Sequence, residues 1–493
     1  MPKRVAIIDI GSNSARVVIY HRTSRFGFHL IAQKKAAVRI SEGSFDNNGI
    51  LQENAIERTI EALHTFKSII SDYKARKTII VATAAVRNAP NRDTFIQRVR
   101  KELGLKIKVI DGNKEAFFGA VAATNLLPLK STAITVDIGG GSTDIALIED
   151  NKVIDTLSIK IGTITIKELF FDKQKPLSKT KEYINSLLED IPEKFQQATE
   201  VIAIGGVLRA VAKSIIMHSN YSYSKIHAFN YQYSDYAEHI ASIIDAKDSK
   251  ELNTLWIKPG RYDTIREGLL IFTMLLKKLG IQSVLTSGVG VREGVFLHDM
   301  LRGVGGLFPK DLNPSVVSII DRLDMIQQPK APRIAIMRTL FNTLKGELKN
   351  REEYLKLLKD AVKISDCGKT LTIYDEHKHT YYIAMQELNW QYTHQEMLLI
   401  AAILRSTGEK LLYKTLQKEH QKILPGKKVL RWLAFIYTLS NRLSSYSLKN
   451  RYSFHFEDKV LTIKSNSPLY LFEQDLKNLE LPEDIVIRVA NRY

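Results

Sequence analysis

Cysteine is almost absent from this sequence, since Cys367 is the only one in 493 residues. A single cysteine excludes an intramolecular disulfide framework and is typical of a cytosolic protein. The sequence also lacks an apolar, charge-free run long enough to span a bilayer, and it shows no secretory start. We therefore expect a cytoplasmic protein with no membrane partner. Apolar residues make up 44% of the chain, which suits several globular domains.

Basic residues outnumber acidic ones, and the formal net charge is +18. Such an excess favours anionic partners, although a generally basic surface has the same composition. The excess is concentrated between residues 405 and 451. Its main members are Lys410, Lys414, Lys418, Lys422, Lys427, Lys428 and Arg431. The spacing from Lys410 to Lys422 predicts one lysine per turn along one helix face, which is either a solvated face or a track for a long polyanion.

The predicted secondary structure repeats itself before a Gly- and Pro-rich boundary at residues 303–314. Three strands come first, and then helices and strands alternate in the order βββαβαβα. The first copy has strands at 4–10, 15–20 and 28–40, helix 52–75, strand 78–84, helix 91–103, strand 106–111 and helix 113–125. The second copy starts with strands at 132–138, 143–149 and 152–160, carries an insertion at 218–262 and ends with a helix from residue 290.

Beyond the boundary, residues 315–450 are predicted to be helical, and short alternating segments at 452–456 and 460–464 predict a small β element. We therefore expect an α/β protein with two similar lobes, followed by an α-helical domain with a small β tail. The predicted domains cover residues 1–126, 127–305 and 306–493.

One short motif occurs at the start of both lobes, as DIGSNS at residues 9–14 and DIGGGSTD at residues 137–144. A Gly-rich turn between two strands exposes several backbone N–H groups in one concave surface, and such a surface binds phosphate oxygens. One such turn alone is more often an ordinary β-turn, but two matched turns favour a binding site. The predicted phosphate ligands are Gly11, Ser12, Asn13, Ser14, Gly139, Gly140, Gly141, Ser142 and Thr143.

An aspartate stands at the end of the strand before each turn. A carboxylate there repels phosphate unless a cation lies between them, so Asp9 and Asp137 predict a bound Mg²⁺. Asp144 is expected to be a further metal ligand or to orient a metal-bound water.

These motifs resemble the two phosphate loops of the exopolyphosphatase and guanosine pentaphosphate phosphohydrolase family. Residues 82–91 are similar to the family's Ala-Thr-x-Ala-x-Arg-x-Ala-x-Asn segment. Residues 111–116 resemble its Glu-Ala helix start, and residues 287–294 resemble its late Gly-x-Arg-Glu-Gly turn. The resemblance spans about residues 4–300 and implies an actin-like, ribonuclease-H-like pair of lobes with a cleft between them.

The resemblance also implies roles for single residues. Glu115 would be the catalytic base that activates water, whereas without the resemblance it is simply favourable to the helix dipole. Arg87 would clamp phosphate, and Arg292 would either bind a nearby carboxylate or touch substrate. Two positions depart from the family. Asp144 stands where many members have Glu, and Val207 stands where Thr is usual, which weakens the case for nucleoside binding.

The C-terminal helices resemble the HD-type phosphohydrolase domain often appended in this family. The metal site of that domain needs a His-Asp doublet, which here reads Ser365-Asp366. The other ligand positions also lack His or Asp, so this metal site is expected to be lost. His377 and His379 are interpreted as structural or as contacts for a polyanion. The domain is then expected to form a homodimer and to guide polyphosphate.

The leading hypothesis is an Mg²⁺-dependent exopolyphosphatase that also converts guanosine pentaphosphate into guanosine tetraphosphate. Polyphosphate and these guanosine nucleotides are the expected partners, and nucleic acid is not expected. One alternative is an enzyme dedicated to guanosine pentaphosphate. A second is an actin-like kinase or ATPase, and a third is a non-catalytic protein that binds polyphosphate or the guanosine nucleotides.

Overall fold

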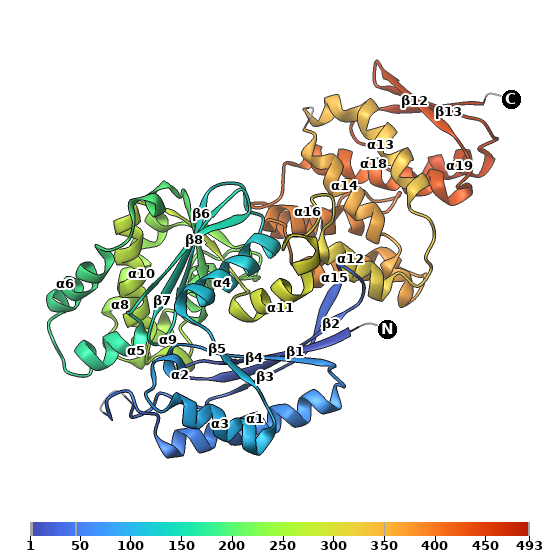
Figure 1. Ribbon diagram of the computed structural model, residues 1–493. Helices are drawn as coiled ribbons and strands as arrows, with labels where there is room; N and C mark the ends of the chain where they lie inside the picture. Colours follow the sequence, from blue (N-terminus) through green and yellow to red (C-terminus); the bar gives the residue numbers. More distant parts are fainter. Residues whose placement is uncertain (1–2, 45–46, 350, 492–493) are drawn as a thin grey trace. The chain divides into compact units, whose positions relative to one another are not determined.

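The computed structural model describes residues 3–44, 47–349 and 351–491. The chain divides into two compact units, Met1–Asp311 and Leu312–Tyr493. The first unit contains two lobes, each with its own β-sheet, whereas the second unit is mainly helical (Figure 1). Within the described part of the chain, no helix is both long enough and apolar enough to cross a membrane.

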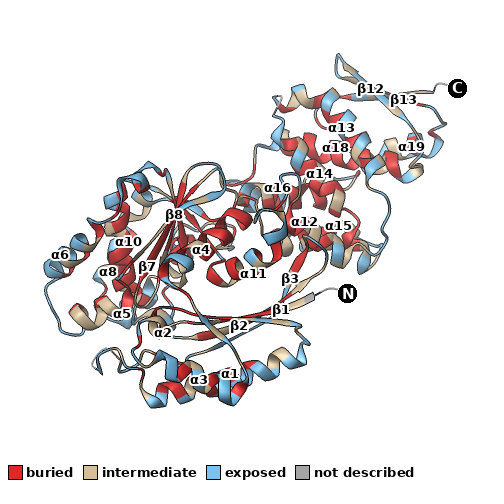
Figure 2. Cartoon of the chain, viewed as in Figure 1, coloured by how far each residue is buried: buried red, intermediate tan, exposed pale blue. Residues whose placement is uncertain are grey.

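The first lobe is a five-stranded sheet in the order β3-β2-β1-β4-β5. The first three strands form an antiparallel meander, and β4 and β5 continue the sheet in parallel with β1. The elements are β1 (Lys3–Ile10), β2 (Ala15–Arg22), β3 (Phe28–Ala36), α1 (Glu53–Asp72), β4 (Lys77–Ala82), α2 (Ala84–Asn88), α3 (Arg92–Leu103), β5 (Ile107–Val109) and α4 (Gly112–Leu126). Helices α1 and α3 cover one face of the sheet, where Ile8, Phe66 and Phe95 are buried (Figures 1 and 2).

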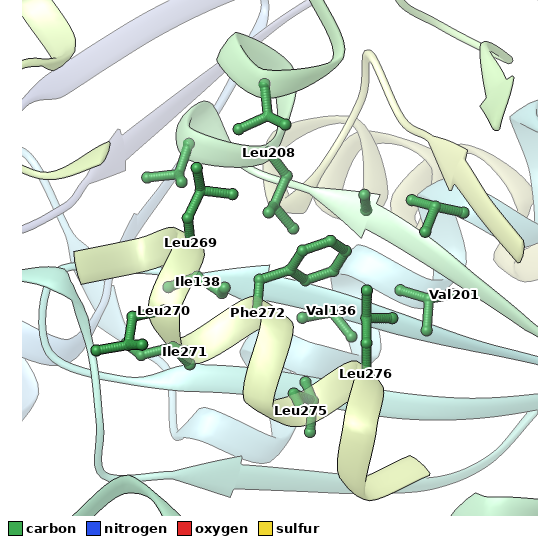
Figure 3. Close-up of a cluster of buried hydrophobic side chains, with 14 of the residues drawn as sticks. Val136, Ile138, Val201, Leu208, Leu269, Leu270, Ile271, Phe272, Leu275 and Leu276 are labelled. Atoms are coloured by element: carbon green, nitrogen blue, oxygen red, sulfur yellow. The ribbon is translucent and has the colours of Figure 1, made fainter. Parts of the chain in front are cut away.

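The second lobe repeats this arrangement on a six-stranded sheet in the order β10-β11-β9-β6-β7-β8. Its elements are β6 (Ala133–Ile138), β7 (Thr143–Glu149), β8 (Lys152–Ile159), α5 (Thr163–Ile166), α6 (Leu177–Leu188), β9 (Glu200–Ile204), α7 (Gly206–His218), β10 (Asn230–Gln232), α8 (Ala237–Asp245), α9 (Ser249–Thr254), α10 (Ile265–Leu279), β11 (Ser283–Thr286) and α11 (Val291–Leu301). Helical spacing places Leu269, Phe272 and Leu276 of α10 in the same core as Val136 and Val201 (Figure 3).

The two lobes meet where α4 packs against α11. Gly294 of α11 lies so close to α4 that a Cβ at this position would be 1.8 Å from the backbone oxygen of Phe118. Only glycine permits this approach, because any side chain would force the helices apart. The crossing therefore fixes the start of α4, which carries Glu115, relative to the second lobe.

The second unit contains a bundle of helices and a small sheet in the order β12-β13-β14. Its elements are α12 (Pro314–Leu323), α13 (Ala331–Leu344), α14 (Glu353–Ile364), α15 (Glu376–Glu387), α16 (His394–Arg405), α17 (Lys414–Glu419), α18 (Lys427–Tyr446), β12 (Tyr452–Glu457), β13 (Val460–Ser465), α19 (Tyr470–Asp475) and β14 (Val486–Asn491). Trp432 and Phe435 of α18 are fully buried in this unit. The predicted fold class is confirmed, and β14 is a third strand of the tail beyond the two segments named from the sequence.

The predicted single basic helix is wrong. Lys410 lies in a turn closed by a bridge to Thr407, and α17 ends before Lys422, which lies in the following turn. The next helix begins only after Pro425 and Gly426, two residues that do not continue a helix. The four-residue spacing of the lysines therefore does not correspond to one continuous helix face.

Candidate active site

Each of the two Asp-Ile-Gly motifs forms the tight turn of a β-hairpin at the same place in its lobe. In the first turn the Gly11 N–H donates to the Ser14 carbonyl at 3.1 Å, and in the second the Gly139 N–H donates to the Ser142 carbonyl at 2.8 Å. The sequence repeat is thus a repeat of backbone geometry. Turns of this kind leave further N–H groups free to point at an anion.

The two turns meet across the cleft between the lobes. A Cβ at Gly140 would be 3.3 Å from the Cβ of Ser12, so the turns are in contact. Beside this contact lies a cavity of about 220 Å³. The predicted site residues that line it are Asp9, Gly11, Ser12, Asn13, Ser14, Glu115, Asp137, Gly139, Gly140 and Ser142. Because a water molecule occupies about 30 Å³, the cavity has room for the end of a phosphate chain.

Glu115 lies in the first turn of α4, whose N-terminus is capped by Asp111 through the Lys114 N–H at 2.7 Å. Arg87 Nη1 donates to Glu115 Oε2 at 3.1 Å and to the Ile110 carbonyl at 3.0 Å. Burial raises the pKa of Glu115 well above its usual range, and the nearby carboxylate of Asp144 raises it further. Arg87 opposes both effects, because its positive charge favours the ionised carboxylate that a general base requires.

Asp144 lies on β7 and is 3% exposed. Its Oδ2 accepts a hydrogen bond from Ser142 Oγ at 3.0 Å, and its Oδ1 accepts one from Ser158 Oγ. Burial raises the pKa of Asp144 to about 7, although both serines favour the ionised form. Each of its oxygens thus accepts one hydrogen bond, and the role of Asp144 as a metal ligand or as a group that orients a metal-bound water stays a prediction. Within the described residues, no group of three His, Cys, Asp or Glu side chains is arranged to hold a metal.

Asp9 and Asp137 face the cavity from the two lobes. Burial raises the pKa of both carboxyl groups, that of Asp137 to about 6, and the neighbouring arginines Arg292 and Arg209 lower them. Among the described residues neither carboxylate has a hydrogen-bond or ion-pair partner. Two such carboxylates fit Mg²⁺, which is commonly held by one or two carboxylates together with water and substrate phosphates.

Positive side chains also line the cavity. Arg292, for which contact with substrate was one of two predicted roles, is one of them, and Arg16 is another. Lys35, Arg209 and Arg261 line it as well, and the sequence did not identify these three as ligands. Burial and the neighbouring arginines lower the pKa of Arg16 to about 10, which shows how closely these charges are gathered. An anion that carries several negative charges would stabilise such a cluster of cations. Arg209 could have been found from the sequence, because it lies in the first turn of α7, and this helix begins at the Gly-Gly pair that follows β9.

Three predicted phosphate ligands are placed differently from the others, and their roles stay predictions. The Thr143 hydroxyl donates a hydrogen bond to the Ile161 carbonyl of the same lobe at 2.7 Å. Arg87 does not line the cavity and instead pairs with Glu115. Gly141 lines a separate, neighbouring cavity, which also includes Ser12 and Gly140. The sequence identified the turns but not the direction of each donor.

The basic residues of the second unit fall into two groups. The lysines at 410, 414, 418, 422 and 427 are exposed. Lys428, although exposed, pairs with Glu347 and Glu483, and Arg431 pairs with Glu480 at 2.5 Å. The first group is therefore free to meet a polyanion, whereas the second group is held by acidic residues of the same unit.

The position expected for the His-Asp doublet is occupied by an ion network. Arg333 Nη1 donates to Ser365 Oγ at 2.7 Å and to Asp366 Oδ2 at 3.2 Å, and Lys369 Nζ donates to Asp366 Oδ1 at 2.8 Å. Lys330 pairs with the same carboxylate. Burial alone would raise the pKa of Asp366, but these cations hold it well below its usual range. Cationic side chains thus surround the carboxylate that would bind a metal in an HD-type site.

Comparison with known proteins agrees with this geometry. The chain is 26% identical over 452 residues to a guanosine-5′-triphosphate,3′-diphosphate pyrophosphatase of Vibrio campbellii, which covers 89% of this chain and 87% of that protein. It is 28% identical over 298 residues to a bifunctional 3-dehydroquinate synthase/phosphatase of Fusobacterium nucleatum, covering 57% of this chain. The match spans only 44% of the length of that second protein.

A solved structure of the Aquifex aeolicus member of the Ppx/GppA family superimposes with a TM-score of 0.54 and 26% identity, covering 62% of this chain and 99% of that one. An exopolyphosphatase structure from Cytophaga hutchinsonii has a TM-score of 0.53 at 21% identity, covers 62% of this chain and 100% of that one, and shows the shared fold. The sequence profile of the Ppx/GppA phosphatase family matches residues 18–303, a stretch that begins just after the first turn. The family expected from the motifs is confirmed: the chain belongs to the Ppx/GppA phosphatase family.

Proposed function

We propose that this protein hydrolyses the terminal phosphoanhydride bond of inorganic polyphosphate, and that the same site removes the 5′ terminal phosphate of guanosine pentaphosphate. One observation carries the proposal: two backbone turns, the half-buried carboxylate of Glu115 and a group of cations line one cavity. Backbone N–H groups and guanidinium groups are the donors that bind phosphate, and Glu115 has the surroundings of a general base.

Asp9 and Asp137 would hold Mg²⁺, which when bound supplies positive charge to the phosphoryl oxygens. Glu115 in its ionised form accepts a proton from a water molecule, whose oxygen attacks the terminal phosphorus. The bridging P–O bond breaks, and its electron pair stays on the oxygen of the shortened chain. Arg87 supports this step by orienting Glu115 and by favouring its ionised form. Glu115 then returns its proton to solvent, and orthophosphate leaves.

The cations of the cavity offset the charge of the substrate before and during this step. Arg16 comes from the first lobe, whereas Arg209 and Arg292 come from the second, so a phosphate chain in the cavity would contact both lobes. Charge-assisted bonds from guanidinium groups are about twice as strong as neutral ones. Anions of low charge should therefore bind weakly, and chains of several phosphates should bind well.

Two observations support polyphosphate as the main substrate. Val207 lines the cavity and offers no hydrogen bond to a nucleoside. The exposed lysines of the second unit also suit a long polyanion, which a nucleotide does not require. Guanosine pentaphosphate stays in the proposal because the Vibrio relative is named for that activity. The homodimer and the cytoplasmic location expected from the sequence stay predictions.

The direct test is orthophosphate release by the purified protein with Mg²⁺. Long-chain polyphosphate and guanosine pentaphosphate are compared in parallel, with Glu115→Ala as the control. We expect Glu115-dependent release from polyphosphate, with slower release from the nucleotide. Release from the nucleotide alone would redirect the proposal to an enzyme dedicated to guanosine pentaphosphate. No release from either would leave a kinase, an ATPase or a binding protein.

The exposed lysines are tested separately by the triple substitution K414A/K418A/K422A. Three exposed lysines of the first lobe, substituted as K101A/K106A/K108A, provide a control with the same loss of charge. The first variant should bind long-chain polyphosphate more weakly, and the loss should shrink at high salt because surface charges are screened. Both variants should hydrolyse tripolyphosphate at the same rate. Equal losses in the two variants would assign the effect to net charge alone.

A further inference from the structure

A side-chain hydrogen bond links the first lobe to the start of α11. Tyr20 of β2 donates its hydroxyl to Glu293 Oε1 at 2.6 Å, although 273 residues separate the two along the chain. The other carboxylate oxygen, Glu293 Oε2, accepts the Gly290 N–H at 2.8 Å. Glu293 therefore has one oxygen bound to the first lobe and the other to the turn that begins α11.

The direction of the Tyr20 hydroxyl is set by packing. The side chain is 3% exposed, and its ring stacks on Phe296 with the centroids 4.3 Å apart and meets Phe28 edge-on at 6.1 Å. Burial raises the pKa of Tyr20 well above its usual range, and Glu293 raises it further, so the phenol keeps its proton and stays a donor. A donor fixed in this way can hold a carboxylate at one orientation.

Arg292 is the residue next to Glu293, and it lines the cavity. Burial would lower the pKa of Arg292, but the negative charges of Glu293 and Asp9 together raise it above its usual value. Glu293 is thus the strongest attraction on this guanidinium, and Asp9 of the first lobe comes next. As long as Tyr20 and Gly290 occupy both oxygens of Glu293, that carboxylate cannot turn toward Arg292 and draw it from the cavity.

We infer that Tyr20 is a positioning residue, which holds Glu293 so that Arg292 faces the anion bound between the lobes. The inference rests on the proposed function, since it assigns Arg292 to a phosphate chain. Tyr20 touches neither the substrate nor the reacting atoms, and it acts through Glu293 on Arg292.

The test is a double-mutant cycle that measures binding rather than turnover. Tripolyphosphate is titrated with Mg²⁺ into Glu115→Gln protein by calorimetry, with and without Tyr20→Phe and Arg292→Ala. Tyr20→Phe should weaken binding about tenfold, which corresponds to about 1.4 kcal/mol. In the Arg292→Ala background the same substitution should change affinity very little, because it acts only through Arg292.

Tyr392→Phe is the matched control. Tyr392 is also fully buried, and its hydroxyl donates to Asp360 Oδ2 at 2.8 Å within the second unit. Both Tyr→Phe variants should lower the melting temperature by similar amounts, but only Tyr20→Phe should weaken binding. If Tyr20→Phe does not fold, Glu293→Asp provides a second variant, since its shorter side chain keeps the charge but does not reach Tyr20.

The outcomes separate the inference from the proposed function. Equal affinity in the Tyr20→Phe and Tyr392→Phe proteins, or an equal loss from Tyr20→Phe with and without Arg292, would overturn the inference alone. Folded Glu115→Gln protein that binds no tripolyphosphate would remove the proposed function and the inference with it. A tenfold loss that vanishes in the Arg292→Ala background supports both.

Discussion

The two lobes carry the same hairpin turn but different charges at the paired position on the second strand. Asp9 pairs in register with Arg16 in the first lobe, whereas Asp137 pairs with Asp144 in the second. Residues directly opposite each other in an antiparallel pair are close neighbours. The first lobe therefore places a cation beside its carboxylate, and the second lobe places two carboxylates side by side.

This difference shows that a repeated backbone need not mean a repeated function. The second lobe stabilises its extra carboxylate with two serine hydroxyls, and the pKa of Asp144 still rises to about 7. The negative charge of Asp144 in turn raises the pKa of Glu115 on the first lobe. Burial and the charge of Asp144 in the second lobe thus both raise the pKa of the catalytic carboxyl group.

The largest effect is expected from replacing Asp9 and Asp137, the aspartates that occupy the same position in the two lobes. Asp9→Asn and Asp137→Asn should each raise the Mg²⁺ concentration needed for half-maximal phosphate release by about 100-fold or more. Even partners that only orient a metal ligand cost about 10–100-fold, so a direct ligand should cost at least as much. Asp144→Asn is the matched control and should leave the Mg²⁺ requirement nearly unchanged. If Asp144→Asn raises the Mg²⁺ requirement as much as Asp9→Asn does, Asp144 is a metal ligand.

Arg87→Gln tests how the first lobe controls the orientation and the pKa of Glu115. It removes a charge-assisted hydrogen bond to Glu115, which is worth about 1.5–3 kcal/mol, so kcat should fall about 10–100-fold. Arg87 lowers the pKa of Glu115, so its loss raises that pKa and moves the acid limb of the pH–rate profile to higher pH. The measurement is kcat/KM against pH. Arg98→Gln, at an exposed ion-pair site on the same lobe, should leave the profile in place.

Ser158→Ala is the corresponding change in the second lobe, with a smaller expected effect. Ser158 lowers the pKa of Asp144, so Asp144 in the variant should keep its proton to higher pH. A hydroxyl bond to a charged group contributes about 1.5 kcal/mol or somewhat more, so the rate at neutral pH should fall roughly tenfold. The rate should recover as the pH rises and Asp144 ionises. A loss that is the same at every pH would indicate damage to the fold instead.

The smallest effect on activity is expected for Glu267 of α10. Replacing this residue should change the stability of the fold instead. This carboxyl group is 4% exposed, its Oε2 has no hydrogen-bond partner among the described residues, and burial raises its pKa to about 7. In the folded state the Glu267 carboxyl group keeps its proton up to about pH 7, whereas in the unfolded chain it loses the proton at about pH 4.3. Folding stability should therefore fall as pH rises through this window.

Glu267→Gln removes this penalty without changing the shape of the side chain. The variant should be equally stable at about pH 4, and at about pH 8 it should be more stable by up to about 3 kcal/mol. Urea unfolding at both pH values measures the difference. Glu200→Gln is the comparison: burial also raises the pKa of Glu200, but hydrogen bonds from Asn230 and Ser283 favour its ionised form, so this variant should gain less. An equal gain in folding stability at both pH values would contradict the conclusion that ionisation of buried Glu267 destabilises the fold.

The sequence predicted the parts of the site that local chemistry determines. The two turns follow from Gly, Ser and Asp at fixed offsets between apolar strands, and the position of Glu115 follows from the start of a helix. Lys35 and Arg261 could not be found in this way, because each reaches the cavity from a segment distant in sequence. Single arginines and lysines in edge strands or insertions carry no signal that separates them from surface residues.

The sequence failed where the direction of a side chain decides its role. Thr143 has the right residue type at the right place, but its hydroxyl points to the Ile161 carbonyl. The lysine spacing from Lys410 to Lys422 has a helical period, yet α17 covers only Lys414–Glu419, and both end lysines lie in turns. The spacing therefore identified the exposed lysines but not the backbone that carries them.

The ion network around Asp366 has a practical consequence for experiments with this protein. Because Arg333, Lys330 and Lys369 pair with this carboxylate, we expect the second unit to fold without a divalent cation at this position. Adding a chelator such as EDTA should stop phosphate release without unfolding this part of the chain. Calorimetric traces with and without the chelator should coincide for the second unit, so any loss of activity then reports on the catalytic cleft alone.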